Sequence, residues 1–547
     1  MLHSTVFNTS QLCYQLGVRH AVMSPGSRNA PLTISFARYD DIEKWIIPDE
    51  RSAGFIALGI AQETKSPVVL CCTSGSALLN YAPAIAEAYY REIPLIVMSA
   101  DRPPELIDQR DGQTIRQFES LKNHVKDSFQ LPIIQNKKEA NDYQSSIIEA
   151  IRLSTRLPLG PVHINIPFRE PFYPSVDDDL SFNPVVFRDQ VEDQRSDESR
   201  NFDLSNYERP LLLVGQLPVD GELNSMLSIL SEKIPVVRSP LNNLGSGIQH
   251  VDGFINNQSE LKPDLLLTSG LSVLSKKLKH FLRKNSPKKH LHFDAGGVSV
   301  DTYKSSPQLI KYSLKDWLKF ASFDDLATDF IELWKNYEEL TQNAISNFCA
   351  TATFSEVTTA LQALAALPDS SNLHLSNSMS VRYADLFGIK NGVECYANRG
   401  TSGIDGCTST ALGTSLVSSK INTLITGDLA FLYDRNAFFH NYRTPNLRII
   451  ILNNQGGGIF RLIDGPSALP ELEDYFETRH NKTAEYICLE NGLEYVTANN
   501  ERELEFHLST FYEASSTTKV LEVFTDPETN QQIFKDLKKH INECINN

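Results

Sequence analysis

Short apolar runs alternate with longer segments of helical, amphipathic pattern over the first 175 residues. Such runs, bounded by glycine, proline or small polar residues, are typical of buried strands joined by helical crossovers. The predicted strands are 20–24, 66–72, 94–99 and 160–166. This part of the chain therefore predicts an α/β domain built on a doubly wound parallel sheet.

The same alternation occurs twice more along the chain. Runs at 210–215, 233–237, 264–268 and 290–294 predict a second, Rossmann-like sheet. Its first turn, at Gly215, lacks the Gly-x-Gly-x-x-Gly pattern, so no dinucleotide is assigned. After a helix-rich stretch at 313–365, a third α/β unit ends with a strand at 519–524. The fold class is α/β with three doubly wound parallel-sheet domains, of which the first and third are candidates for a shared fold.

Charged residues separate the first two units. Asp177-Asp-Asp179 and most of residues 191–200 are polar or charged, as expected of an exposed linker. We expect domains at 1–178, 206–345 and 352–547, with a linker at 179–205.

Composition narrows the classes of function. The formal net charge is 51 − 67 = −16, which argues against a nucleic-acid-binding protein. The eight cysteines contain no Cys-x-x-Cys pair and predict small apolar residues in a reducing compartment. The N-terminus lacks the pattern of a signal peptide, and no apolar run reaches the roughly 18 residues of a membrane span. These features predict a cytoplasmic protein.

Two strand-like runs in the third unit end in oxygen-rich turns. Gly427-Asp428 follows the run at 421–426, and Asn453-Asn454-Gln455-Gly456 follows the run at 447–452. One β-α-β crossover would bring Asp428 and Asn454 to the same edge of a sheet. Their side-chain oxygens and a backbone carbonyl suit Mg²⁺ bridging a diphosphate, as in the thiamine diphosphate (ThDP) motif. The alternative is an ordinary strand-turn-helix with polar turn residues.

A second motif, Asp49-Glu50-Arg51, begins a helical pattern. A glutamate at this position is commonly explained by the favourable field of a helix N-terminus. With a diphosphate site elsewhere in the chain, a second interpretation arises. A buried glutamate that protonates the aminopyrimidine N1′ of ThDP is what makes this cofactor reactive.

Beyond these motifs, the chain resembles the SEPHCHC synthase family (2-succinyl-5-enolpyruvyl-6-hydroxy-3-cyclohexene-1-carboxylate synthase) of the menaquinone pathway. The resemblance spans nearly the whole chain in family order. It implies pyrimidine-binding, central and diphosphate-binding domains. The matching segments are 24–32, 49–51, 99–107 with Gln113, 377–382, 398–406 and 453–460.

Matching positions imply roles in binding the cofactor. Glu50 is the implied catalytic partner of N1′, and Ile404 the apolar wedge that bends ThDP. Mg²⁺, or Mn²⁺ with the same oxygen ligands, would be held by Asp428, Asn454 and the Gly456 carbonyl. The remaining implied cofactor contacts are Asn377, Ser378, Ser402 and Gly403.

The implied substrates, 2-oxoglutarate and isochorismate, each carry two carboxylates, which arginine binds in bidentate fashion. Lys277 departs from the arginine that the family often has, and Gln455 replaces a frequent asparagine. For a single arginine the alternative is a surface salt bridge, and for Ile463 it is core packing. The implied substrate-binding residues are Ser27, Arg28, Arg102, Gln113, Lys276, Lys277, Arg382, Arg399, Ile459, Phe460 and Ile463.

The resemblance implies a transferase acting as a carboligase, which decarboxylates 2-oxoglutarate and adds the succinyl-semialdehyde unit 1,4 to isochorismate. Another ThDP-dependent 2-oxo acid decarboxylase or carboligase is the closest alternative. A ThDP-binding scaffold with a lapsed site is disfavoured by the intact Glu50, Asp428 and Asn454. The family also implies a homodimer with active sites at the interface, or a homotetramer built from such dimers.

Overall fold

The computed structural model describes residues 4–170, 172–174, 181–183, 206–256, 258–321, 329–463 and 465–546. Three parallel sheets, of six, five and six strands, carry the fold. The predicted fold class is therefore confirmed. Most of the predicted linker at 179–205 lies outside the described residues, and the domain boundaries stay predictions.

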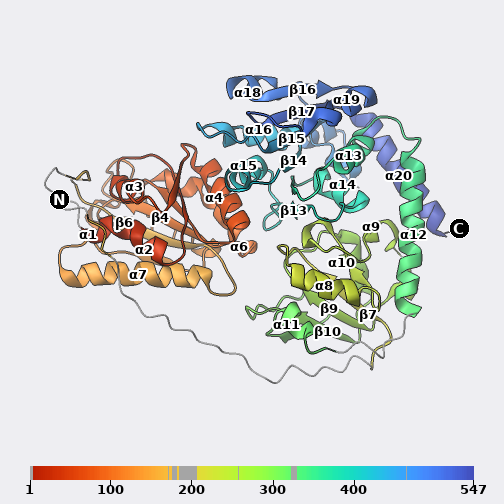
Figure 1. Cartoon of the computed structure of the whole chain (residues 1–547), viewed down its shortest axis with the longest axis horizontal. Helices are drawn as coiled ribbons and strands as arrows, with labels where there is room; N and C mark the ends of the chain where they lie inside the picture. Colours follow the sequence, from red (N-terminus) through yellow and green to blue (C-terminus); the bar gives the residue numbers. More distant parts are fainter. Residues whose placement is uncertain are drawn as a thin grey trace. The chain divides into compact units, whose positions relative to one another are not determined.

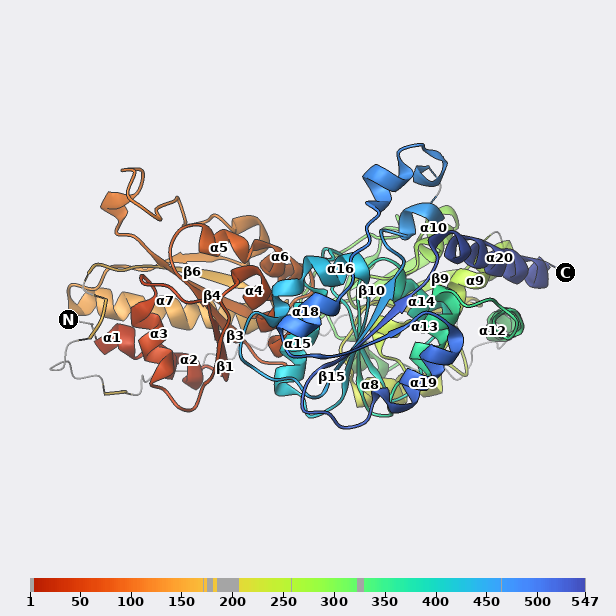
Figure 2. The same ribbon diagram turned by 90° about the horizontal axis from the view of Figure 1, so that it is seen from above.

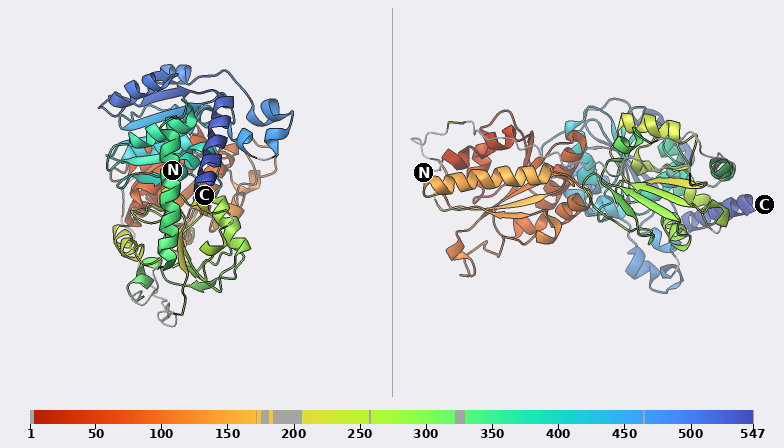
Figure 3. Two further views of the ribbon diagram at one scale, coloured as in Figure 1. Left: turned by 90° about the vertical axis from the view of Figure 1, so that its right-hand side faces the viewer. Right: turned by 90° about the horizontal axis from the view of Figure 1, so that it is seen from below.

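The first sheet has the order β2-β1-β3-β4-β6-β5. Its inner strands are apolar because helices cover both faces, and every residue of β3 and β4 is buried. The long helix α7 runs along one side of this sheet (Figures 1 and 3). The strands are β1 (His20–Met23), β2 (Glu43–Ile46), β3 (Val68–Cys72), β4 (Leu95–Asp101), β5 (Ser128–Gln130) and β6 (Val162–Pro167). The helices are α1 (Ser4–Phe7), α2 (Thr9–Gln15), α3 (Ala30–Ala37), α4 (Glu50–Thr64), α5 (Ser76–Asn80), α6 (Ala82–Tyr90) and α7 (Lys137–Thr155).

The second sheet has the order β11-β10-β9-β7-β8. Leu212 and Val214 of β7 pack into a core on one face, and Leu211 and Leu213 pack into another. This alternation shows that both faces are covered. The strands are β7 (Pro210–Val214), β8 (Val236–Val237), β9 (Leu265–Ser269), β10 (Lys289–Phe293) and β11 (Gln308–Ile310). The helices are α8 (Gly221–Leu230), α9 (Val251–Phe254), α10 (Lys276–Lys284), α11 (Leu314–Leu318) and α12 (Asp329–Cys349).

The third sheet has the order β13-β12-β14-β15-β17-β16, which repeats the order of the first sheet strand for strand. The strands are β12 (Asn372–Leu375), β13 (Glu394–Tyr396), β14 (Asn422–Gly427), β15 (Leu447–Asn453), β16 (Glu494–Ala498) and β17 (Lys519–Phe524). The helices are α13 (Glu356–Ala365), α14 (Met379–Phe387), α15 (Cys407–Val417), α16 (Asp428–Tyr433), α17 (Ile459–Leu462), α18 (Glu485–Glu490), α19 (Glu501–Phe511) and α20 (Pro527–Asn546).

The chain forms two compact units, which interleave in sequence. The first comprises residues 1–191, 398–419 and 430–447, and the second comprises 192–397, 420–429 and 448–547. In the first unit, α4 packs closely on α15. In the second unit, α12 and α20 lie side by side (Figures 1 and 3). None of the helices in the described ranges is long and apolar enough to cross a membrane.

Candidate active site

The oxygen-rich turns of the second unit meet at one edge of the third sheet. The neighbouring strands β12, β14 and β15 end at Leu375, Gly427 and Asn453. From β12 the chain crosses first to β13 on one side and then to β14 on the other. Ligands of open α/β sheets bind at such a switch point, outside the carboxyl ends of the strands.

Asp428 and Asn454 converge on one backbone amide. The Gly456 N–H donates to Asp428 Oδ2 at 3.0 Å and to Asn454 Oδ1 at 3.1 Å. Both side chains are buried. Two side-chain oxygens and the nearby Gly456 carbonyl form a hard donor set that fits Mg²⁺.

The Glu477 carbonyl lies against the backbone of the turn at residues 454–456. A Cβ at Gly456 would lie 2.8 Å from the Glu477 carbonyl oxygen, so this position admits only glycine. The Gly457 N–H donates to the same carbonyl at 2.8 Å. Gln455 has a φ of +66°, a left-handed conformation that asparagine adopts more readily. The turn is therefore strained at the position where the chain departs from the family.

A buried glutamate, Glu356, touches this turn through Asn454. Its pKa is raised to about 7, mainly by burial. No group of three or more His, Cys, Asp or Glu side chains within the described residues could hold a metal ion. The predicted site does not need one, because only Asp428 of its ligands belongs to those types.

The other implied cofactor contacts of this unit follow β12. Asn377 is buried, and Ser378 has a φ of +78° immediately before α14. Arg382 lies one turn into that helix and is half-buried. These residues thus lie at the same sheet edge as Asp428 and Asn454.

Glu50 is the first residue of α4, in the first unit. The preceding Asp49 caps the helix by accepting from the Ser52 N–H at 3.0 Å. Glu50 is half-buried, and its desolvation raises the pKa of the carboxyl above the usual value. A carboxyl with this tendency suits the holding of a proton against a ring nitrogen.

The loop before α15 carries Arg399, Ser402, Gly403 and Ile404. The fully buried Glu87 of α6 accepts from the Gly400 N–H at 2.8 Å and from the Thr401 N–H at 2.6 Å. Ser402 has a φ of +64°, so the loop holds a strained residue at an implied cofactor contact.

Two predicted substrate residues follow β1 and β4, the two strands that flank β3 in the first sheet. Arg28, after β1, is buried; its Nη1 donates to the Phe168 carbonyl at 2.8 Å. Arg102, after β4, lies 3.8 Å from Asp111. The Nε atoms of both arginines are buried and have no hydrogen-bond partner in the described part of the chain. Each guanidinium group thus has a buried N–H that the described residues leave without an acceptor.

Ser27 and Gln113 are exposed at the same sheet edge. A Cβ at Gly75, which follows β3, would lie 3.4 Å from the Gln113 backbone. Gln113 itself has a φ of +54°. Polar side chains therefore lie near the ends of β1, β3 and β4. They belong to Ser27, Arg28, Arg102 and Gln113.

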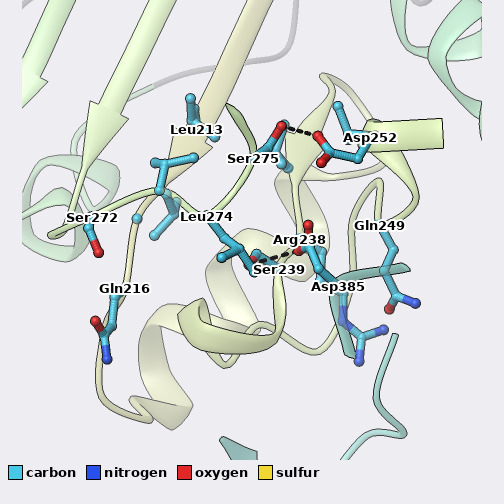
Figure 4. Close-up of a pocket in the computed structure, with 15 residues that line it drawn as sticks. Leu213, Gln216, Arg238, Ser239, Gln249, Asp252, Ser272, Leu274, Ser275 and Asp385 are labelled. Carbon is cyan, nitrogen blue, oxygen red and sulfur yellow. Dashed lines mark hydrogen bonds between the residues drawn. The ribbon is translucent and has the colours of Figure 1, made fainter. Parts of the chain in front are cut away.

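The lysine pair lies at the start of α10, in the second unit. Lys276 is exposed, whereas Lys277 donates from Nζ to the Asp252 carbonyl at 2.7 Å. Burial lowers the pKa of Lys277. The preceding Ser275 donates to Asp252 at the rim of a small cavity (Figure 4).

That cavity lies beyond the ends of β7 and β9 (Figure 4). Arg238 and the Ser239–Asp385 hydrogen bond, of 3.3 Å, line another side. Its volume of about 20 Å³ accommodates about one water molecule, so it is not a substrate pocket.

The apolar residues among the predicted substrate contacts follow the turn at residues 454–456, here called the metal turn. Ile459 packs partly against the core of the third sheet, and the ring of Phe460 lies 5.7 Å from that of Phe476. Ile463 is 40% exposed, which argues against the alternative of core packing. The chain after residue 465 projects from the body of the second unit (Figure 2) before Glu477 returns to the metal turn.

The structure thus places Ser27, Arg28, Arg102 and Gln113 at a sheet edge of the first unit, and Asn377, Ser378, Arg382, Asp428 and Asn454 at a sheet edge of the second. Glu50 begins α4, the loop with Arg399 to Ile404 precedes α15, and the lysine pair begins α10. Sequence reasoning missed the buried carboxylates Glu87 and Glu356. Glu87 has a signal, since it is the single charge in the apolar helix Ala82–Tyr90. Glu356 has none, because a glutamate after a capping serine is ordinary.

Comparison with known proteins places this geometry in a family. A family model described as "Thiamine pyrophosphate enzyme, N-terminal TPP binding domain" matches residues 9–127. A solved structure of a candidate thiamin diphosphate-dependent enzyme from Mycobacterium smegmatis shares the fold, with a TM-score of 0.71 at 17% identity. The match covers 96% of this chain and 100% of that one.

Curated relatives match nearly end to end, and all three below are 2-succinyl-5-enolpyruvyl-6-hydroxy-3-cyclohexene-1-carboxylate synthases. The chain is 44% identical to that of Cytophaga hutchinsonii, over 98% of this chain and 99% of the relative. Identity is 40% with Christiangramia forsetii (95% and 96%) and 38% with Flavobacterium psychrophilum (97% and 98%). These matches confirm the resemblance that predicted thiamine diphosphate, the transferase class and menaquinone biosynthesis. The chain belongs to the 2-succinyl-5-enolpyruvyl-6-hydroxy-3-cyclohexene-1-carboxylate synthase family of thiamine diphosphate enzymes.

Proposed function

We propose that this protein decarboxylates 2-oxoglutarate and adds the resulting succinyl-semialdehyde unit 1,4 to isochorismate, with ThDP and Mg²⁺. The main support in a chain of this family is that side-chain oxygens of Asp428 and Asn454 both accept from the Gly456 N–H. When bound, ThDP supplies the carbon nucleophile and the electron sink for loss of CO₂.

The residues of the second unit would hold the cofactor's charged end. Asp428, Asn454 and the Gly456 carbonyl would bind Mg²⁺, and Mn²⁺ would fit the same oxygens. Asn377 and Ser378 would lie beside the diphosphate, at the N-terminus of α14, where the helix field favours an anion. Ile459, Phe460 and Ile463 would exclude water beside the reacting carbon, which favours loss of a charged carboxylate.

The residues of the first unit would handle the proton and the ring. Glu50 would hold the proton at the pyrimidine N1′, and its raised pKa supports that role. Ile404 would press on the bent cofactor, with Ser402 and Gly403 beside the pyrimidine. We further propose a homodimer in which these groups complete the site, or a homotetramer of such dimers. Sedimentation equilibrium would distinguish the two.

Cationic side chains would bind the four substrate carboxylates and so orient the two reactants. The buried, unpartnered Nε atoms of Arg28 and Arg102 support this part of the proposal. Arg382 and Arg399 would act likewise, with Ser27 and Gln113 as neutral contacts. We include Lys276 and Lys277 as well, although Lys277 already donates to a backbone carbonyl. A cytoplasmic location fits the eight free cysteines.

The test is to incubate the protein with ThDP, Mg²⁺, 2-oxoglutarate and isochorismate, and to follow isochorismate loss together with product mass. A product of isochorismate mass plus a succinyl-semialdehyde unit is expected. Release of CO₂ with isochorismate untouched would move the assignment to another ThDP decarboxylase or carboligase. No turnover of either substrate by folded protein would contradict the proposal.

Glu50→Gln tests the assigned proton role. Removal of a general acid–base group typically costs a factor of about 10²–10⁴ in rate, and we expect kcat to fall by this range. Binding of ThDP should be largely retained, because glutamine keeps the shape. Glu43→Gln, at an exposed glutamate of β2, is the matched control and should leave kcat unchanged. Equal activity of Glu50→Gln and wild type would refute the role.

A further inference from the structure

The buried carboxylate of Glu356 forms no ion pair with the described residues and is bound by two neutral side chains. Glu356 is 4% exposed and is the first residue of α13. Its backbone N–H donates to Asn530 Oδ1 at 2.8 Å, which fixes the start of the helix against α20. The position of the Glu356 backbone is therefore fixed at the start of α13.

Each carboxylate oxygen of Glu356 accepts one hydrogen bond. Asn454 Nδ2 donates to Oε1 at 2.6 Å, and the Tyr383 hydroxyl donates to Oε2 at 2.9 Å. The first distance is short, as in hydrogen bonds to an ionised acceptor. Tyr383 is itself buried, so a fixed side chain also holds the second carboxylate oxygen of Glu356.

This contact decides which end of the Asn454 amide faces the metal turn. In its ionised form the Glu356 carboxylate only accepts hydrogen bonds, so the Asn454 amide turns its Nδ2 towards Glu356. Its Oδ1 then points to the Gly456 N–H, 3.1 Å away, alongside Asp428 Oδ2. The flipped amide would present an N–H group where a cation needs an oxygen.

We propose that Glu356 is a positioning residue of the metal site, which fixes the Asn454 amide with its oxygen towards the cation. Tyr383 holds Glu356 in turn. This inference rests on the proposed function, because it takes Asn454 as a metal ligand. Outer partners of metal ligands commonly act in this way, and their loss typically costs about 10- to 100-fold in metal affinity.

Two substitutions of Glu356 distinguish the effect of side-chain length from the effect of charge. Glu356→Gln keeps the length and an oxygen that can accept from Asn454, but it removes the charge. Glu356→Asp keeps the charge but withdraws the carboxylate by one methylene. A positioning role predicts the larger defect for Glu356→Asp, whereas a purely electrostatic role predicts it for Glu356→Gln.

The measured quantity is the Mg²⁺ concentration at which ThDP binding is half-maximal. Circular dichroism of the bound cofactor, without substrate, detects the binding. We expect a rise of about 10- to 100-fold for Glu356→Asp and Glu356→Ala, and a smaller rise for Glu356→Gln. Tyr383→Phe should give an intermediate rise in the required Mg²⁺ concentration, because Glu356 loses the hydrogen bond to its Oε2. Glu505→Ala, at an exposed glutamate of α19, is the control and should match wild type.

Wild-type Mg²⁺ dependence in Glu356→Asp and Glu356→Ala would overturn the inference, as would a larger defect in Glu356→Gln than in Glu356→Asp. Far-ultraviolet spectra check folding, and the Asp and Gln variants decide the question if the Ala variant does not fold. Absence of Mg²⁺-dependent ThDP binding in wild type would instead refute the proposed function, so the two failures are distinguishable.

Discussion

The Arg51 guanidinium donates from Nη1 to the backbone carbonyl oxygen of Asp405, 2.8 Å away. Arg51 follows Glu50 in the chain, and Asp405 follows Ile404. One side chain of the first unit therefore joins the helix that carries the proposed proton-holding group to the loop that carries the proposed wedge. Arg51 Nη2 also donates to the Tyr433 carbonyl at 3.0 Å and lies 3.6 Å from the buried Asp434 carboxylate.

Arg51→Met should destabilise the protein. The substitution keeps the aliphatic stem but leaves two carbonyls without their donor and Asp434 without its cation. Loss of the cation beside the buried Asp434 carboxylate costs about 2–4 kcal/mol in the free energy of unfolding. Denaturant titration measures it. Arg443→Met, at an exposed arginine of the same unit, should change it by less than about 0.5 kcal/mol. Equal losses in both variants would contradict this role of Arg51.

Asp434 predicts a pH-dependent stability. Burial raises its pKa to about 7 in the folded protein, against about 3.9 in an unfolded chain. Between these values the folded state binds the proton and the unfolded state does not. The contribution of Asp434 to the free energy of unfolding is therefore lost as the pH rises from about 4 to about 7.

Asp434→Asn removes this titration. The difference in free energy of unfolding, wild type minus variant, should fall with pH by at most about 1.4 kcal/mol per unit and level off above about pH 7. Denaturation at half-unit steps from pH 5 to 8 gives the curve. A difference that stays constant from pH 5 to 7 would show that Asp434 does not titrate there.

Gly413→Ala should disrupt the packing of α15 on α4. A Cβ at this position would lie 2.2 Å from the Ile56 carbonyl oxygen, and rigid backbone cannot yield to it. Alanine favours a helix by about 1 kcal/mol over glycine, but we expect the clash to outweigh this and to lower the free energy of unfolding by about 2 kcal/mol or more. Thermal and denaturant unfolding measure the change.

The matched control is Gly221→Ala at the start of α8, where a Cβ meets nothing within 4 Å. That substitution should be neutral or slightly stabilising. A neutral Gly413→Ala would mean that the two helices do not approach as closely as described.

The buried strands were predictable because their surroundings dictate their composition. The predicted strands at 20–24, 66–72, 94–99 and 160–166 correspond to β1, β3, β4 and β6, and the run at 519–524 matches β17. Covered on both faces, such strands are continuous apolar runs. The edge strands β2 and β5 were missed, because they are short and carry mixed residues, such as Glu43-Lys-Trp-Ile46.

Site residues were predictable where they directly follow the end of a strand. Asp428 and Asn454 could be identified because the end of a parallel strand places the next polar residue at the sheet edge. The partners of Glu356 and Glu87 could not be predicted, since each glutamate reaches its turn from a helix distant in sequence. Only the folded backbone shows that Glu87 meets the Gly400 and Thr401 amides.

The shared strand order of the first and third sheets bears on how such a protein can evolve. The strands of the first sheet lead into Arg28 and Arg102, and those of the third sheet lead into Asp428 and Asn454. The same strand order therefore supports edges that present different polar groups. These residues occupy turns, and the apolar strands beneath them do not depend on their charge. New ligand preferences can therefore arise by exchange of a few turn residues, while the sheet that supports them is inherited unchanged.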